Sequence, residues 1–248
     1  SSMKEVGAGK KTVIYGWSQG GGATITAAGL PDYQAQKGTA ADDLQYLGFV
    51  ALAPEDVAAM LPNIPKDEAS AKKLVSGFTQ ANVPNIFLFT HYVMGLWGTQ
   101  AAFPNLKLSD LLTDEGVKAV EKLASNKCVH VLSDTFNFLY GDSYKSLLRP
   151  EPSNALAWIK GFVDGSVKPV KPVAPVIIYW GSKDVTVPPI MGELYQKQMC
   201  AMGANVSRIQ LPGEQSHFTT PGVSAPMYLE WVKDRVAGKP LANGCPKS

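Results

Sequence analysis

The stretch Gly16-Trp17-Ser18-Gln19-Gly20 follows the apolar run Thr12-Val13-Ile14-Tyr15. The pattern G-x-S-x-G between a strand and a helix is typical of a nucleophile elbow, a sharp turn that exposes a serine hydroxyl. Glycines on both sides of Ser18 leave room for a strained backbone at the serine. We expect the small residues at 20–23, Gly-Gly-Gly-Ala, to let the following helix pack closely against the strand.

The pattern along the rest of the chain predicts an α/β fold. Apolar runs at 11–15, 47–53, 176–180 and 205–211 indicate buried strands. Near-continuous apolar strands that alternate with helices are typical of a mostly parallel sheet with helices on both faces. The expected helices span 19–30, 56–61, 69–80, 86–97, 106–112, 115–124, 155–163, 190–202 and 225–237.

Helical patterns dominate a long insertion between two of these strands. From 54 to 167 strand signals are few, so we predict a large helical cap there. The α/β core is then expected at 1–53 and 168–248, and the polar, turn-rich stretch at 31–43 is expected to be a loop within it.

Composition excludes several classes of protein. The chain has 248 residues, of which 45% are apolar and 18% charged, as in an ordinary globular protein. A net charge of +2 gives no reason to expect nucleic acid or acidic membranes as partners. No apolar run approaches the roughly 18 residues that cross a bilayer, so we expect no stable membrane insertion.

A serine nucleophile needs a general base and a carboxylate that orients the base. His217 follows the last predicted strand, whereas His91 and His130 lie in the inserted region. Asp184 comes at the carboxyl end of the strand at 176–180, and Glu214 is the rival acid. The order serine, acid, histidine is that of an α/β-hydrolase.

These positions predict a role for each residue in acyl transfer. Ser18 is expected to be the nucleophile, His217 the general base and Asp184 the group that orients it. The backbone N–H of Gln19, at the start of the helix, is expected to donate to the oxyanion.

No metal or cofactor is expected. The chain has no H-E-x-x-H, no paired C-x-x-C and no carboxylate cluster with ligand spacing. Gly20-Gly21-Gly22 does not fit a phosphate-binding loop. Asn205-Val206-Ser207 matches a glycosylation sequon, which is a short pattern that also arises by chance.

Three cysteines, Cys128, Cys200 and Cys245, leave at least one unpaired within the chain. Free buried thiols are one interpretation. However, Cys245 lies in the polar tail Asn243-Gly244-Cys245-Pro246, where a free thiol would be exposed. A disulfide that anchors this tail, with Cys200 as the candidate partner, is therefore favoured.

Two stretches resemble the secretory lipase family, which contains fungal lipase A and many bacterial relatives. They are residues 194–206, LYQKQMCAMGANV, and the loop Trp180-Gly181-Ser182-Lys183-Asp184 with Val187-Pro188 after it. The resemblance runs from the elbow to the C-terminus. It implies that Ser18, Asp184 and His217 form a catalytic triad and that Cys200 pairs with Cys245. It also implies a lipase or esterase fold with a helical cap, and secretion of the protein.

The position of the elbow motivates a further hypothesis. Ten residues precede the elbow strand at 11–15, whereas family members have a long stretch there. That stretch supplies early strands, a second oxyanion donor and a cysteine that pairs with Cys128. We therefore expect a companion N-terminal segment or chain, with Cys128 as the candidate link. A minimal hydrolase with a rearranged sheet is the alternative.

The leading functional hypothesis is a serine hydrolase that cleaves carboxylic esters of lipid or other apolar acyl groups. A serine peptidase or an acyltransferase on the same scaffold is an alternative, because the triad does not fix the substrate. A catalytically dead, hydrolase-like binding protein is another. Aromatic residues in the predicted cap suit an acyl pocket or, alternatively, the cap's own core. They are Phe87, Phe89, Tyr92, Trp97, Phe103, Phe136, Phe138 and Tyr140.

Overall fold

A computed structural model describes residues 9–30, 44–56, 58–61 and 63–246. The chain forms two compact units. The first, here called the sheet unit, contains Ser1–Met60 and Ser166–Ser248. The second, the helical unit, contains Leu61–Gly165. The loop expected at 31–43 lies outside the described residues.

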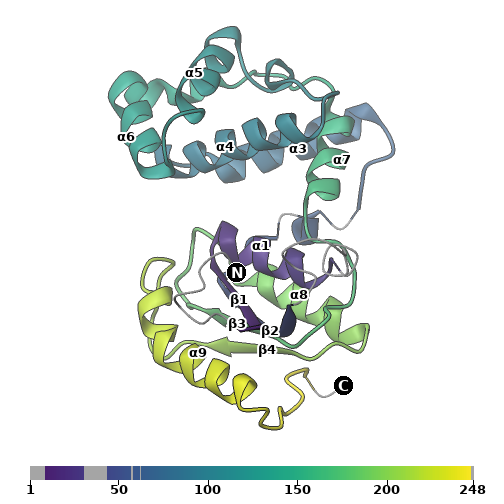
Figure 1. Cartoon of the computed structure of the whole chain (residues 1–248). Coiled ribbons are helices and arrows are strands. Elements are labelled where there is room, and N and C mark those ends of the chain that lie inside the picture. The colour runs from purple at the N-terminus through teal and green to yellow at the C-terminus, as the bar shows by residue number, and fades with distance from the viewer. Residues whose placement is uncertain (1–8, 31–43, 57, 62, 247–248) are drawn as a thin grey trace. The chain divides into compact units, whose positions relative to one another are not determined.

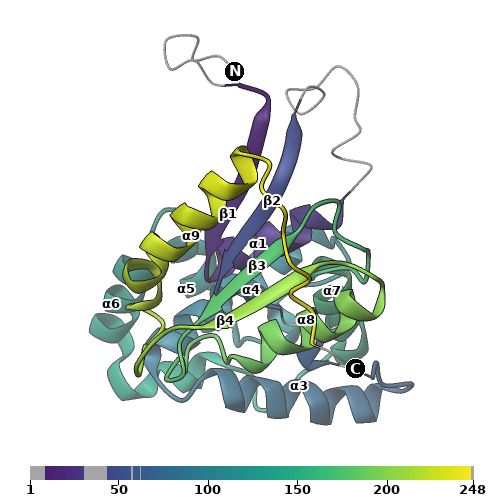
Figure 2. The same cartoon turned by 90° about the horizontal axis from the view of Figure 1, so that it is seen from below.

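The sheet unit is built on four parallel strands (Figure 2). They are β1 (Lys11–Trp17), β2 (Gln45–Leu52), β3 (Val176–Trp180) and β4 (Val206–Gln210), in the spatial order β1-β2-β3-β4. The predicted parallel sheet is therefore confirmed. Because the strands are parallel, the loops at their carboxyl ends meet at one edge of the sheet.

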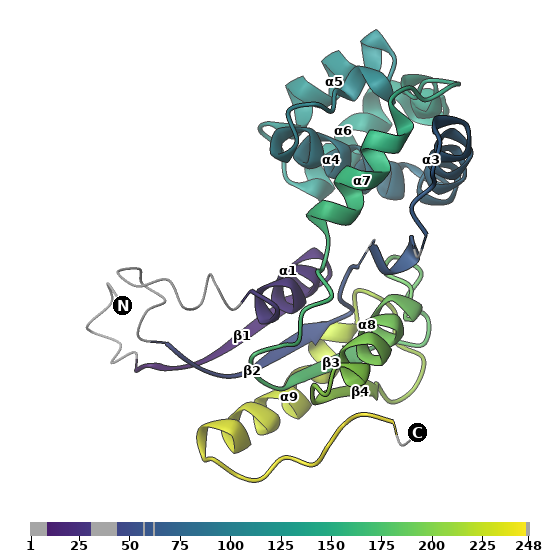
Figure 3. The same ribbon diagram turned by 90° about the vertical axis from the view of Figure 1, so that its right-hand side faces the viewer.

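Helices cover both faces of this sheet, as predicted (Figure 3). Helices α1 (Gln19–Ala28) and α8 (Ile190–Ala201) pack on the face that carries Ile178. Helix α9 (Thr220–Val236) packs on the opposite face, which carries Tyr179. Successive side chains of a strand point to opposite faces, and every described residue of β3 except Trp180 is buried. The near-continuous apolar runs thus reflect burial on two sides.

The helical unit consists of helices around a core of its own (Figure 1). Phe89, Phe136 and Trp158 are fully buried in it. Most of the aromatic side chains considered for an acyl pocket contribute to this core, whereas Phe138 is 88% exposed. Its helices are α3 (Glu68–Asn82), α4 (Ile86–Ala102), α5 (Asp114–Ala124), α6 (Val129–Tyr140) and α7 (Ala155–Gly165), with 3-10 turns η3 (Leu108–Asp110) and η4 (Gly141–Leu147).

Several expected helices differ from the observed ones. The helix expected at 106–112 is only the turn η3, because the side chain of Asp110 accepts from the N–H of Lys107 and closes a short turn. Of the helix expected at 56–61, the described part forms the 3-10 turn η2 (Ala58–Met60). Helix α6 was not predicted, since its buried side chains are few, including Leu132 and Phe136.

Helix α9 begins at Thr220, five residues before its expected start at 225. Pro221 lies in the first helical turn, where a proline costs no hydrogen bond, so the helix can include it. Pro226 lies farther inside the same helix.

The C-terminal tail is fixed to the sheet unit by several contacts. Cys200 and Cys245 form a disulfide, which confirms the expected pairing. The Asn205 side chain donates to the Ala242 carbonyl at 3.1 Å and accepts from the Gly244 N–H at 2.8 Å. The amide of the possible glycosylation sequon is therefore hydrogen-bonded to the tail. Cys128, at the start of α6, is exposed and free.

Within the described ranges, no helix is long and apolar enough to cross a membrane.

Candidate active site

Ser18 lies at a strained turn between β1 and α1. Its backbone has φ 60° and ψ −124°, a conformation that residues with a side chain rarely adopt. The Ser18 N–H donates to the Leu52 carbonyl at 2.9 Å, and the Ser18 carbonyl accepts from the Gly22 N–H at 3.0 Å. The first bond holds the turn against the end of β2 and the second begins α1, so the surrounding structure stabilises the strain.

Backbone carbonyl oxygens lie so close to three of the elbow's glycines that a side chain would not fit there. A Cβ on Gly16 would collide with the Gly20 carbonyl, and one on Gly22 would collide with the Glu55 carbonyl. A Cβ on Gly21 would lie 2.8 Å from the Leu52 oxygen. Gly20 and Ala23 are instead exposed, and a Cβ on Gly20 would contact nothing. The expectation that all of residues 20–23 enable close packing is therefore wrong for these two.

The three predicted side chains form one hydrogen-bond chain. His217 Nε2 lies 2.9 Å from Ser18 Oγ, and His217 Nδ1 lies 2.8 Å from Asp184 Oδ2. Asp184 is 5% exposed and His217 is 4% exposed, so water is largely excluded from the bond between them. The arrangement lets a proton leave the serine hydroxyl toward an imidazole whose other nitrogen is held by a carboxylate.

The second oxygen of Asp184 fixes the carboxylate in its loop. Oδ1 accepts from the backbone N–H groups of Thr186 at 3.0 Å and Val187 at 2.8 Å. The rival acid, Glu214, is exposed and forms an ion pair with Lys183 at 3.3 Å. The structure therefore brings Asp184 rather than Glu214 to the histidine.

The other predicted residues lie as follows. Gln19 is the first residue of α1, and the leading N–H groups of a helix have no partner within it. Its N–H therefore lies at the N-terminus of α1, directly after Ser18. In the helical unit, His91 Nδ1 lies 2.9 Å from the Phe87 carbonyl, and His130 packs against the Phe87 ring.

Sequence reasoning missed Arg208, which contacts both ends of the loop that carries Asp184. Its guanidinium lies 4.1 Å from the centroid of the Trp180 ring and donates to the Pro189 carbonyl at 3.0 Å. Burial lowers the pKa of Arg208, and the charge of Glu193 opposes that shift. An arginine inside a short strand carries no sequence signal for this role.

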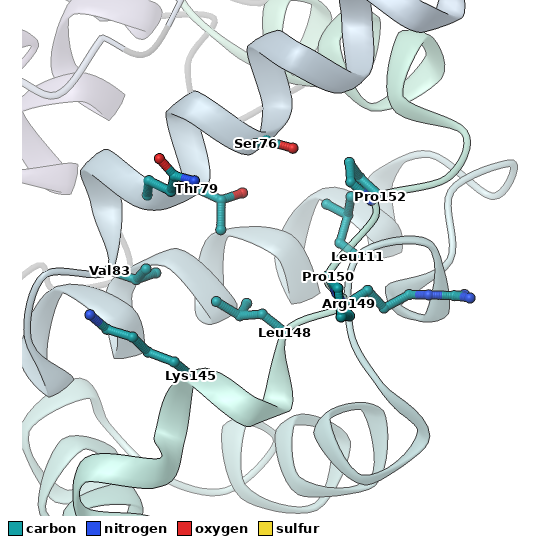
Figure 4. A pocket seen from close by; sticks show the side chains of 10 residues that line it. Ser76, Thr79, Val83, Leu111, Lys145, Leu148, Arg149, Pro150 and Pro152 are labelled. Carbon is teal, nitrogen blue, oxygen red and sulfur yellow. The ribbon is translucent and has the colours of Figure 1, made fainter.

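The helical unit contains a separate pocket of about 270 Å³ (Figure 4). Its lining combines apolar side chains, such as Val83, Leu111 and Leu148, with Lys145 and Arg149. In Figure 4 the charged ends of Lys145 and Arg149 extend in opposite directions away from Leu148. None of the predicted site residues lines this pocket.

Comparison with known proteins identifies the family. Residues 90–244 match the family model described as secretory lipase. The chain belongs to the secretory lipase family. The chain is 26% identical to Lipase 9 of Candida albicans over 253 aligned positions, and the match covers 95% of the chain and 48% of that protein. It is 32% identical to Lipase 5 of the same organism over 78 residues, or 32% of the chain and 17% of that protein.

Solved structures of low sequence identity share the fold. The LipA esterase of Xanthomonas oryzae, described as degrading rice cell walls, has a TM-score of 0.69 at 13% identity, covering 96% of this chain and 62% of that one. Candida antarctica lipase A has a TM-score of 0.68 at 20% identity, covering 99% and 55%. The chain therefore has the α/β-hydrolase fold.

The chain spans about half the length of Lipase 9, and the shorter match to Lipase 5 covers a smaller share of that protein. In these relatives the matched region is part of one longer chain. The expectation of a separate companion chain linked through Cys128 finds no support in these comparisons.

Proposed function

We propose that this protein is a serine hydrolase that cleaves carboxylic esters, with lipid or other apolar acyl esters as substrates. The observation that carries the proposal is the hydrogen-bond chain from Asp184 through His217 to Ser18. Membership of the secretory lipase family supports esters as the substrate class.

The reaction proceeds through an acyl-enzyme. Ser18 Oγ attacks the ester carbonyl carbon while His217 Nε2 accepts the hydroxyl proton. The tetrahedral intermediate then expels the alcohol, whose oxygen takes the proton from Nε2. Water attacks the acyl-serine in the same way, the carboxylic acid leaves and Ser18 regains its proton.

Two groups stabilise the charges that form in this reaction. Asp184 accepts a hydrogen bond from Nδ1–H, which holds the imidazole in the required tautomer and stabilises the imidazolium. The backbone N–H of Gln19 donates to the oxyanion, and the partial positive charge of the α1 N-terminus favours the same atom.

We also propose that the protein is secreted and that residues 54–167 act as a cap that binds the acyl group. The family supports secretion. Phe138, an exposed aromatic side chain in these residues, supports a site for an acyl group there.

The direct test compares the wild type with Ser18→Ala on esters of short and long acyl chains. Ser182→Ala is the matched control, because Ser182 is an exposed serine in the loop that carries Asp184. We expect Ser18→Ala to lose at least about 10³-fold in kcat while keeping the wild-type circular dichroism. Retained ester hydrolysis in Ser18→Ala would contradict the proposal. Faster cleavage of peptide amides than of esters by the wild type would exclude the ester as the substrate class.

A further inference from the structure

Trp17, the residue before the proposed nucleophile, packs on the imidazole of His217. The two ring centroids are 5.0 Å apart and the planes are inclined by 33°. Phe218 contacts the same imidazole edge-on, with centroids 5.4 Å apart and an interplanar angle of 88°. Two aromatic rings therefore restrict the plane of the imidazole, in addition to its hydrogen bonds to Ser18 and Asp184.

Packing alone does not favour a tryptophan here. Among the described residues, Trp17 Nε1 is buried and has no hydrogen-bond partner. A buried N–H without a partner destabilises a fold, and a phenylalanine would fill the position without that penalty. What the indole adds is the strongest attraction for a cation among the aromatic faces.

We propose that Trp17 is a positioning residue that stabilises the imidazolium of His217 during acyl transfer. This inference rests on the proposed function. When Ser18 Oγ bonds to the carbonyl carbon, its proton moves to Nε2 and the imidazole becomes positively charged. The negative face of the indole attracts that charge until the proton passes to the leaving alcohol.

The charged groups around His217 are few, so the effect of Trp17 on the imidazolium can be separated from theirs. The hydrogen bonds and ring contacts of His217 within the described ranges involve one charged group, the carboxylate of Asp184. Ser18 on the elbow and Phe218 on the same loop are neutral. The nearby charges of Lys183 and Glu214 pair with each other in solvent. A change at Trp17 therefore leaves the charged partner of the imidazole in place.

The experiment compares Trp17→Leu and Trp17→Phe with the wild type. We expect kcat on a soluble ester to fall about tenfold in Trp17→Leu and less in Trp17→Phe, with KM unchanged. The acidic limb of the pH–rate profile should move to lower pH in Trp17→Leu, because the imidazolium loses a stabilising contact. Trp17→Phe keeps an aromatic ring and removes the unpartnered N–H, which partly offsets the packing lost with the larger indole.

Trp231→Phe is the matched control. Trp231 also has a buried Nε1 without a partner among the described residues, and the Arg235 guanidinium lies 5.6 Å from its ring. Trp231 lies on α9, and its ring packs closely on Gly48 of β2. We expect its replacement to leave kcat and the pH–rate profile unchanged.

An NMR titration of His217 tests the inference without relying on activity. In Trp17→Leu the imidazole should take up its proton at lower pH than in the wild type, and its ring-proton resonances should move as the indole ring current is lost. Unchanged resonances, or an unchanged titration and kcat in folded Trp17→Leu, would overturn the inference. Failure of the proposed function would appear differently, as equal activity in the wild type and Ser18→Ala.

Discussion

Lys183 donates its backbone N–H to the carbonyl oxygen of Gln215 at 2.9 Å. This bond joins the loop that carries Asp184 to the loop that carries His217. Gly181 packs so closely on the same carbonyl that a Cβ there would collide with it. The two loops therefore act as one support, and the distance from carboxylate to imidazole depends on backbone contacts.

The first prediction concerns the identity of the acid. Asp184→Asn should lower kcat by about 10³–10⁴-fold, because an amide at this position favours the wrong imidazole tautomer. Glu214→Gln is the control and should leave kcat unchanged, since it removes only an exposed ion pair with Lys183. Ester hydrolysis by the two purified variants decides between them. Equal losses in both would contradict the role given to Asp184.

The second prediction concerns the contact between the loops. Gly181→Ala should destabilise the protein by about 1–3 kcal/mol, because the new methyl group collides with backbone. It should also lower kcat by up to about 10²-fold through displacement of Asp184 from His217. Gly222→Ala, where a Cβ meets nothing within 4 Å, should stabilise α9 by about 0.5–1 kcal/mol. Urea unfolding of both variants tests this, and equal free energies of unfolding would show the prediction to be wrong.

The third prediction concerns the C-terminal tail. Asn205→Ala removes both hydrogen bonds between this side chain and the tail, so we expect a loss of about 1–2 kcal/mol in stability. Asn126→Ala, which removes one exposed bond to the Lys122 carbonyl, should change stability by less than about 0.5 kcal/mol. Thermal unfolding under non-reducing conditions measures both. The account of the tail fails if Asn205→Ala unfolds at the wild-type temperature.

The fourth prediction concerns alkaline pH. Burial raises the pKa of Tyr92 and of Tyr179 from 10.0 to about 12, and the bond to Thr79 only partly offsets this for Tyr92. These phenols lose their protons near pH 10 in the unfolded chain and near pH 12 in the folded protein. Their contribution to stability is therefore fully present below about pH 10 and is lost as the pH rises through about 12. The free energy of unfolding should therefore fall above about pH 10. Tyr92→Phe should make this fall shallower, and the same slope in wild type and variant would refute the assignment to Tyr92.

Local sequence was enough to predict the sheet and the hydrogen-bond chain. The run Val176–Trp180 lies between Pro175 and Gly181, two residue types that commonly end a strand. The observed strand β3 has the same bounds. The elbow motif located Ser18, and chain order selected Asp184 and His217. These features depend on short patterns that physical chemistry ties to one conformation.

Long-range contacts that no local motif marks could not be predicted. Trp17 and His217 are far apart in the chain, and only the folded sheet brings their rings together. Arg208 has no local pattern that links it to Trp180. Gly20 was misjudged because sequence cannot tell which elbow glycines face the neighbouring strand. Helix α6 was missed because few of its side chains are buried.

The central claim, that the hydrogen-bond chain activates Ser18, is tested most directly by an organophosphonate that labels activated serines. The intact protein is treated with the reagent, and the modified residue is located by peptide mass spectrometry. The account predicts one modification at Ser18 in the wild type, none in Ser18→Ala and much slower labelling in His217→Ala. Labelling at another residue, or equal rates in the wild type and His217→Ala, would contradict it.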